Sequence, residues 1–441
     1  MPLLKINWRR LVRLQRVILA AVILFPATAH ALELEPRHRP DSPLPVIEYS
    51  AELSYSDYVE QARDIILNRH PHADKILPGT NGLKVVDLIA PKQWPRASTC
   101  GTPKKGILLI HGLSDSPYTV GDVGDDLNRD CALVRSVLLP GHSTVPGDLV
   151  AVTDQDWINA SNWAIQSFAG EVEELVILGY STGATLALEY VIRNQSKTAA
   201  SRSLALGGSH DKAATQTTKI TGLILLSSAI AINTSVSFMA GWVDCLGSIF
   251  NERWRWASID KDLDFAKYES FPMNAAAQIH NLIKRMGERD DKANPVSVPV
   301  LMISSKQDTT INAIKTIEFF ENRTTSNSKM LLYNSDITKI TDTRIEVRDS
   351  TNHAKNILSL GHTSMSMKPS NAHYGENGDY VSCLHYGSGS EQESCLDRSN
   401  TDIRYGEVTE ENKAKGTLRR ISWNHDYDYA LDRMNQFLES L

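Results

Sequence analysis

A serine flanked by glycines carries the clearest chemical signal in the sequence. Residues 179–183 read Gly-Tyr-Ser-Thr-Gly, a pattern that is weak evidence alone because short motifs arise by chance. Here an apolar run ends at Leu178 and a helical pattern begins at Thr182, so the motif falls between a strand and a helix. The context predicts that Ser181 is a nucleophile on a sharp, strained turn at a helix N-terminus, where free N–H groups favour developing negative charge.

The backbone near this serine could stabilise a negatively charged intermediate. An oxyanion hole requires two fixed N–H donors. We expect one from Thr182, directly after the serine, and the other from Leu113, which follows the apolar run 107–110. Gly112 would let the backbone approach closely. His111 is interpreted as a structural hydrogen-bonding residue and not as a base.

A nucleophilic serine of this type needs a carboxylate and a histidine, each at the carboxyl end of a strand and in the order Ser, Asp or Glu, His. Asp308 follows the apolar run 300–303 and is predicted to orient the imidazole. Asp336, one strand later, is the alternative.

The histidine is less clearly marked, because five candidates follow Asp308 in the chain: His353, His362, His373, His385 and His425. We expect the base to be His362, which ends the apolar segment 357–361. It would take the proton of the serine hydroxyl and return it to the leaving group. His353, in a polar stretch, is the second candidate.

The elements that position these residues follow from the alternation of short apolar runs with amphipathic segments. The runs are too short for buried helices and rich in Val, Ile and Leu, as strands buried on both faces are: 107–110, 132–139, 175–178, 220–226, 300–304 and 330–333. The clearest helical segments are 182–194, 311–321 and 427–438. The predicted fold class is α/β, with a mostly parallel central sheet flanked by helices.

Two stretches interrupt this alternation. Residues 196–218 are rich in Ser, Thr, Ala and Gly, which predicts a flexible surface insertion. Residues 230–295 are aromatic-rich, helical in character and placed between two strands, which predicts a helical cap. The predicted organisation is an export signal, an N-terminal extension, the first half of the core, the cap, and a second half with an extended C-terminal segment: 1–31, 32–105, 106–229, 230–295 and 296–441.

The first 31 residues are typical of an export signal. Basic residues precede the apolar run 17–25, and Ala-Thr-Ala-His-Ala follows it, which predicts cleavage after about Ala31. An uncleaved membrane anchor is the alternative, although the run is shorter than the ~20 residues needed to span a bilayer. We expect a periplasmic or secreted protein without stable membrane insertion after signal removal.

The net charge narrows the range of partners. The whole chain has a net charge of −6, and residues 1–31 hold five basic and no acidic side chains, so the remaining chain carries −11. An acidic surface argues against binding of nucleic acid or of anionic lipid headgroups.

Five cysteines in an exported chain favour disulfide bonds. Cys383 and Cys395 flank a loop rich in Gly and Ser. Cys100 and Cys131 each precede a predicted strand, and they can pair if those strands are neighbours. Cys245 is then left over, and five free buried thiols are the alternative. No CxxC or Cys/His spacing indicates a metal site.

With these residues in hand, the sequence resembles bacterial carboxylesterases and monoacylglycerol lipases of the α/β-hydrolase superfamily. The matching segments are 109–117, 140–142, 179–183 and 307–310. The resemblance implies a Ser/Asp/His triad, two backbone oxyanion donors, a cap, no cofactor, and a structural or cleft-lining role for His142. The segment 336–356 and the tail 363–423 depart from the family pattern. We expect residues 371–375 of this tail to form part of the wall of the cleft.

The leading functional expectation is a serine hydrolase that cleaves acyl esters, including lipid esters, through an acyl-enzyme on Ser181. One alternative is a serine aminopeptidase or amidase, whose substrate amine would need carboxylates in the cap: Glu252, Asp260, Asp262, Asp264 and Glu269. Another is a non-catalytic binding protein on the same scaffold.

Overall fold

The computed structural model describes residues 33–77, 80, 82–129, 131–204, 218–232, 252–289, 294–336 and 340–441. The predicted export signal and Cys245 lie outside these residues, as does the part of the predicted insertion from 205 to 217. Within the described ranges, no helix is both long and apolar enough to cross a membrane.

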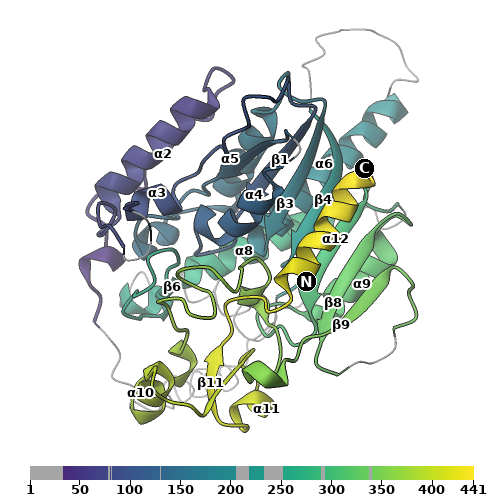
Figure 1. The fold of residues 1–441 in the computed structure, drawn as a ribbon. Coiled ribbons are helices and arrows are strands. Elements are labelled where there is room, and N and C mark those ends of the chain that lie inside the picture. Colours follow the sequence, from purple (N-terminus) through teal and green to yellow (C-terminus); the bar gives the residue numbers. More distant parts are fainter. Residues whose placement is uncertain are drawn as a thin grey trace, which may run out of the picture.

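A seven-stranded sheet forms the centre of the molecule (Figure 1). Its strand order is β2-β1-β3-β4-β7-β8-β9, and every neighbouring pair is parallel. All six predicted runs are strands of this sheet, so the α/β prediction is confirmed. The seven strands are β1 Lys105–Ile110, β2 Leu133–Val137, β3 Glu174–Tyr180, β4 Lys219–Leu226, β7 Val300–Ser305, β8 Lys329–Asn334 and β9 Ile345–Asp349.

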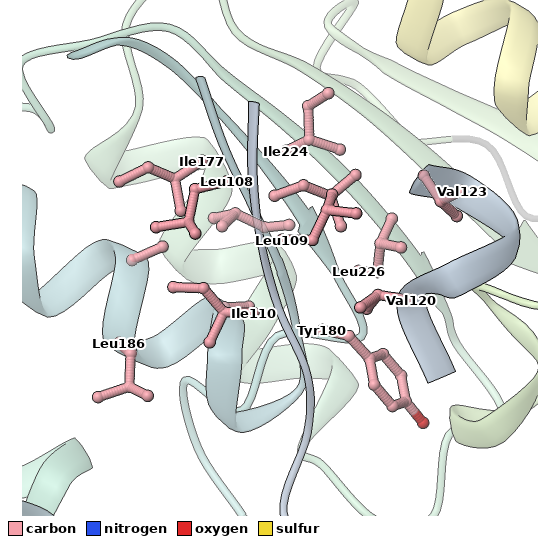
Figure 2. Packing of buried hydrophobic residues seen from close by; sticks show 14 of the residues in the cluster. Leu108, Leu109, Ile110, Val120, Val123, Ile177, Tyr180, Leu186, Ile224 and Leu226 are labelled. Atoms are coloured by element: carbon pink, nitrogen blue, oxygen red, sulfur yellow. The ribbon is translucent and has the colours of Figure 1, made fainter. Parts of the chain in front are cut away.

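The central strands form because both of their faces are covered by apolar side chains. Residues 107–110 of β1 are at most 1% exposed. Figure 2 shows Leu108 beside Ile177 of β3, while Leu186 of α6 and Val123 of α4 approach the strands from different sides. Burial on two faces explains the continuous apolar runs of the sequence.

Helices connect the strands and cover the sheet. The predicted helices 311–321 and 427–438 are α9 and α12, and the predicted helix 182–194 is the first part of α6. The α-helices are α2 Tyr55–Arg69, α3 Val85–Ile89, α4 Gly121–Leu127, α5 Asp154–Gln166, α6 Thr182–Leu204, α8 Met273–Arg289, α9 Ala313–Arg323, α10 Ser390–Leu396, α11 Glu410–Lys413 and α12 Tyr427–Glu439. Short 3₁₀ turns are η1 Pro36–His38, η2 Pro117–Val120, η3 Pro146–Val150, η4 Glu252–Arg255, η5 His353–Lys355, η6 His362–Ser364 and η7 Leu384–Tyr386.

Two expectations need correction. Helix α6 continues to Leu204, so residues 196–204 are helical and not part of a flexible insertion. The segment 336–356 contains β9, a seventh strand that the sequence did not reveal. β9 lies at the edge of the sheet, where charged Glu346 and Arg348 are only partly buried, so no apolar run marks it.

Of the chain between β4 and β7, the structure describes residues 227–232, 252–289 and 294–299. The range 252–289 contains the short antiparallel pair β5 Trp256–Ser258 and β6 Phe271–Pro272, followed by α8, which packs against α6. In the loop 259–270, the backbone N–H of Tyr268 donates to the carbonyl of Ser114 over 2.9 Å. This loop therefore rests on the turn that follows β1.

The C-terminal segment, residues 363–423, carries a small group of helices and strands outside the central sheet. It contains α10, α11 and the parallel pair β10 Ile403–Gly406 and β11 Thr417–Arg420, which lie together at the lower end of the molecule in Figure 1. Both predicted disulfides are present, Cys383–Cys395 in this segment and Cys100–Cys131 beside β1 and β2.

Candidate active site

Ser181 occupies the turn between β3 and α6 with a φ of 53°, a left-handed conformation that is strained for a serine. Its N–H donates to the Leu226 carbonyl of β4 over 2.9 Å, which holds the turn against the sheet. A Cβ on Gly183 would lie 2.2 Å from the backbone oxygen of Ile110, and one on Gly179 would meet the backbone of α6. Only glycines therefore allow this close approach.

His362 and Asp308 lie next to this serine. The Nε2 atom of His362 is 3.0 Å from the Ser181 hydroxyl, and its Nδ1 atom is 2.7 Å from Oδ2 of Asp308. An ionised carboxylate only accepts hydrogen bonds, so Nδ1 carries the proton and Nε2 accepts from the serine. The structure thus brings together the three residues that the sequence predicted.

The second oxygen of Asp308 fixes the orientation of the carboxylate. Asp308 follows β7, and its Oδ1 accepts hydrogen bonds from the backbone N–H groups of Thr310 and Ile311 at 2.8 and 3.0 Å. One carboxylate oxygen is therefore held by the backbone and the other is presented to the imidazole.

The alternative residues lie elsewhere. Asp336 follows β8 and hydrogen-bonds through its backbone to Asn334. His353 is exposed in η5. Neither residue lines the cavity that Ser181 lines.

The two expected oxyanion donors, Leu113 and Thr182, line the same cavity as Ser181. Within the described part of the chain, neither backbone N–H donates a hydrogen bond to another residue. Both groups are therefore available to a substrate oxygen.

Two buried histidines support the turn after β1. His142 accepts the backbone N–H of Ser114 at Nε2 over 3.0 Å, and His111 accepts that of Leu139 over 3.0 Å. Burial holds the pKa of His111 well below its usual range and lowers the pKa of His142 to about 4. Both rings are neutral and fully used in hydrogen bonds to the backbone, which suits structural roles.

The cavity has a volume of about 450 Å³ and two chemically different regions. Its apolar wall is formed by side chains of several elements: Leu113, Ile232, Phe271, Ile279, Ile311 and Met367. The remaining wall carries polar groups from the loop 259–270 and the C-terminal segment: Asp264, Lys267, Glu269, Tyr374, Tyr380 and Arg420. The stretch 371–375, expected to wall the cleft, contributes Tyr374.

The carboxylates that line the cavity are bound to protein groups. Asp115 forms an ion pair with Lys267 at 2.8 Å, and Glu269 accepts from the Tyr380 hydroxyl over 2.6 Å. Asp264 accepts hydrogen bonds from His373 and Tyr374. Of the five cap carboxylates considered from the sequence, only Asp264 and Glu269 line this cavity.

The His373 cluster joins the loop 259–270 to the C-terminal segment. His373 donates to Asp264 through Nε2 over 2.9 Å and to Asp379 through Nδ1, and the Tyr374 hydroxyl donates to Asp264 over 2.6 Å. Burial lowers the pKa of His373, but its hydrogen bonds to the two carboxylates outweigh burial and raise the pKa to about 9. The ring is therefore a cation at neutral pH.

Two residues beside His362 carry no signal in the sequence. Glu407 is buried and forms an ion pair with the partly exposed Arg420, and its carboxylate also accepts the backbone N–H of His362. They lie in the tail that no sequence motif covers, and their contacts depend on residues far away in the chain. Across the described residues, no group of three or more His, Cys, Asp or Glu side chains could hold a metal ion.

The seven-stranded parallel sheet, with a strained serine on the turn after β3, defines the α/β-hydrolase class of proteins. Residues 101–335 match the family model Hydrolase_4, described as serine aminopeptidase, S33. This match spans more than half of the chain, so the chain belongs to that family and is a hydrolase. No curated protein was found to match the sequence.

Several solved structures resemble this one at low identity. A metagenome-derived lipolytic enzyme of the pair LipS and LipT has 15% identity and a TM-score of 0.41, over 60% of this chain and 88% of that chain. The monoacylglycerol lipase of Paleococcus ferrophilus has 17% sequence identity and a TM-score of 0.40, over 56% of this chain and 88% of that chain. A soluble variant of the monoglyceride lipase of Saccharomyces cerevisiae has 14% sequence identity and a TM-score of 0.39, over 56% of this chain and 82% of that chain. Similarity at this level assigns no substrate.

Proposed function

We propose that the protein is a serine hydrolase that cleaves carboxylic esters, with Ser181 as nucleophile, His362 as general base and acid, and Asp308 as the residue that orients the imidazole. The observation that carries this proposal is the continuous hydrogen-bonded series from the serine hydroxyl through the imidazole to the carboxylate. Ser181 and His362 line a cavity that also has an extended apolar wall.

The chemistry follows from these positions. His362 takes the proton of Ser181 as the hydroxyl oxygen attacks the ester carbonyl, and the resulting oxyanion accepts hydrogen bonds from the N–H groups of Leu113 and Thr182. Collapse of the intermediate expels the alcohol, which receives the proton from His362. Water then attacks the acyl-serine by the same route and releases the acid.

The walls of the cavity favour an ester with an apolar acyl group. Side chains such as Phe271, Ile279 and Ile311 offer an apolar surface beside Ser181, which suits an alkyl or aryl chain. A lipid ester and a small soluble ester both satisfy this requirement.

A serine aminopeptidase or amidase is the second candidate, and one observation favours it. Asp264 and Glu269 line the cavity, and a substrate amine could meet either carboxylate. However, both carboxylates already accept hydrogen bonds from protein groups, so an amine would have to compete with Tyr374, Tyr380 and His373. The ester proposal needs no such displacement.

We also propose that the mature protein acts outside the cytoplasm. Disulfides are typical of oxidising compartments, and this chain has two. The basic and apolar pattern of residues 1–31 supports export through an N-terminal signal.

The proposed activity is tested with two substrate series. Purified protein should hydrolyse p-nitrophenyl butyrate and octanoate, while Ser181→Ala should lose roughly 10⁵- to 10⁶-fold in kcat, because the nucleophile is removed. Aminoacyl-naphthylamides should be cleaved far more slowly than the esters. Faster naphthylamide cleavage would favour the peptidase instead, and equal ester hydrolysis by both proteins would refute the role of Ser181. Failure of a fluorophosphonate to label the wild-type serine would favour a non-catalytic binding protein.

A further inference from the structure

The C-terminal segment places an ion pair between the buried Glu407 and the partly exposed Arg420 next to the proposed catalytic base. Glu407 follows β10, and Arg420 ends the neighbouring strand β11. The Glu407 side chain is fully buried, and its two oxygens accept from Nε and Nη2 of Arg420 at 2.8 and 3.2 Å. A buried ion pair is weak evidence for stability by itself, because desolvation offsets the attraction of the charges. Its partners at this position indicate a more specific role.

The first partner is the backbone of His362. Oε2 of Glu407 accepts the His362 N–H over 2.8 Å. On the other side of the same residue, the His362 carbonyl accepts the hydroxyls of Tyr180 and Ser227, each at 3.2 Å. The peptide groups on both sides of the imidazole are therefore fixed by hydrogen bonds, one to the C-terminal segment and two to residues at the ends of β3 and β4.

The preceding residue admits the carboxylate. A Cβ on Gly361 would lie 2.2 Å from Oε2 of Glu407, so any larger residue would displace either the carboxylate or His362. The hydrogen bond between Glu407 and the His362 backbone thus depends on a glycine at 361.

The second partner is the loop that carries Asp308. Oε1 of Glu407 accepts the Thr309 hydroxyl over 3.1 Å, and Nη2 of Arg420 donates to the Thr310 hydroxyl over 2.9 Å. The same ion pair therefore contacts the residue that bears the imidazole and the two residues after the carboxylate that orients it. A misplacement of about 1 Å between such groups can cost about 100-fold in rate.

We infer that Glu407, held by Arg420, is a positioning residue that fixes His362 relative to Asp308 and Ser181. The inference rests on the proposed function. It gives the C-terminal segment a specific part in catalysis, since without Glu407 the backbone N–H of His362 would lose its hydrogen-bond acceptor.

The test compares Glu407→Gln with the matched control Glu411→Gln, which makes the same change at an exposed glutamate of α11 that pairs with Lys415. The glutamine keeps the size of the side chain but turns an NH₂ group toward a site lined by donors. We expect kcat to fall about 10- to 100-fold with KM changed by less than about twofold, because the base and not the substrate site is displaced. The control should keep the wild-type values.

A purely structural role is separated by counting competent sites. Titration with a fluorophosphonate gives the fraction of molecules whose serine reacts, and kcat is then expressed per reactive site. Loss of stability alone would reduce the number of sites and leave kcat per site unchanged, which would overturn the inference. Positioning predicts the opposite result, with slower labelling and lower kcat at a full complement of sites.

A second variant covers failure of the first to fold. Arg420→Lys keeps the charge but loses the paired hydrogen bonds of the guanidinium, so it should lower kcat per site by a smaller factor of about 3 to 10. If Glu407→Gln is insoluble, a kcat per site in Arg420→Lys equal to that of the wild type would reject the inference.

The rate of fluorophosphonate labelling can be measured without knowing the natural substrate. A wild-type protein that is never labelled would refute the proposed function, whereas a labelled wild type matched by Glu407→Gln would refute only this inference.

Discussion

At the scale of single residues, close neighbours hold Ser181 and Asp308 in single conformations. Ser181 is held at a φ of 53° because glycines at 179 and 183 let β3, α6 and the turn after β1 approach closely. Asp308 divides its oxygens between two backbone N–H groups and one imidazole nitrogen. Each side chain is thus held in one orientation.

The division of the Asp308 oxygens leads to a prediction for Asp308→Asn. The amide oxygen should stay on the N–H groups of Thr310 and Ile311, so the NH₂ group would face Nδ1 of His362 and force the proton onto Nε2. That tautomer cannot accept the Ser181 proton, and we expect kcat to fall by about 10⁴ at neutral pH. Steady-state ester hydrolysis measures the loss. Asp336→Asn is the matched control, and a larger loss in that variant would show that the wrong aspartate is assigned.

At the scale of elements, the loop 259–270 and the C-terminal segment are joined across the cavity. The His373 cluster supplies the link, since the ring lies between Asp264 of the loop and Asp379 of the segment and packs 4.2 Å from Phe265. Neighbouring contacts are of the same kind, as in the hydrogen bond from Tyr380 to Glu269. These two elements carry most of the polar wall of the site.

The charge of His373 predicts a pH dependence of stability. Its pKa is raised from 6.5 to about 9, so the folded protein binds this proton more tightly than the unfolded chain does. The stabilising contribution, roughly 3 kcal/mol, is fully present below about pH 6.5 and is lost as the pH rises through about 9. Denaturant unfolding between pH 6 and 9.5 should show this loss in the wild type and not in His373→Gln.

The three tyrosines whose rings pack against His373 titrate above this pH range. Burial raises the pKa values of Tyr118, Tyr374 and Tyr380 above their usual range. The hydrogen bond from His373 lowers the pKa of Asp379. An equal loss of stability in His373→Gln would therefore contradict the assignment to this ring.

At the scale of the whole molecule, residues from distant parts of the chain meet at one end of the sheet. The parallel arrangement places the carboxyl ends of β1, β3 and β7 together, and with them Leu113, Ser181 and Asp308. His362 and Glu407 are supplied by the chain after β9, the last strand of the seven-stranded sheet. Two disulfides close loops in different parts of this assembly, with sequence separations of 31 and 12 residues.

The loop lengths predict unequal losses when the disulfides are removed. Replacing Cys100 and Cys131 by serine should lower the free energy of unfolding by about 3–4 kcal/mol, and replacing Cys383 and Cys395 by about 3 kcal/mol, because the unfolded chain regains freedom. Chemical denaturation of protein exported by a bacterial host measures both values. Mass spectrometry of the same sample should give a chain that begins near residue 32 with four protected cysteines. A retained N-terminal segment, or free thiols at these positions, would contradict the proposed export.

The sequence predicted those parts of the molecule whose physical signal is local. Strands buried on both faces have continuous apolar sequences, and the turn at Ser181 has a recognisable motif. The sequence therefore predicted six strands and the position of Ser181. The edge strand β9 leaves no such run, because only one of its five residues is buried. The choice of His362 over His353 depended only on the apolar segment before His362. The contacts of Glu407 could not be predicted, because its partners lie 45 and 98 residues away in the chain.

The order of the site residues along the chain has a consequence for biosynthesis. His362 follows Ser181 by 181 residues, and Glu407 lies further on. A ribosome therefore adds the proposed nucleophile long before it adds the proposed base. Until then the serine has no imidazole beside it, so under the proposed mechanism hydrolysis begins only once the final portion of the polypeptide has been made.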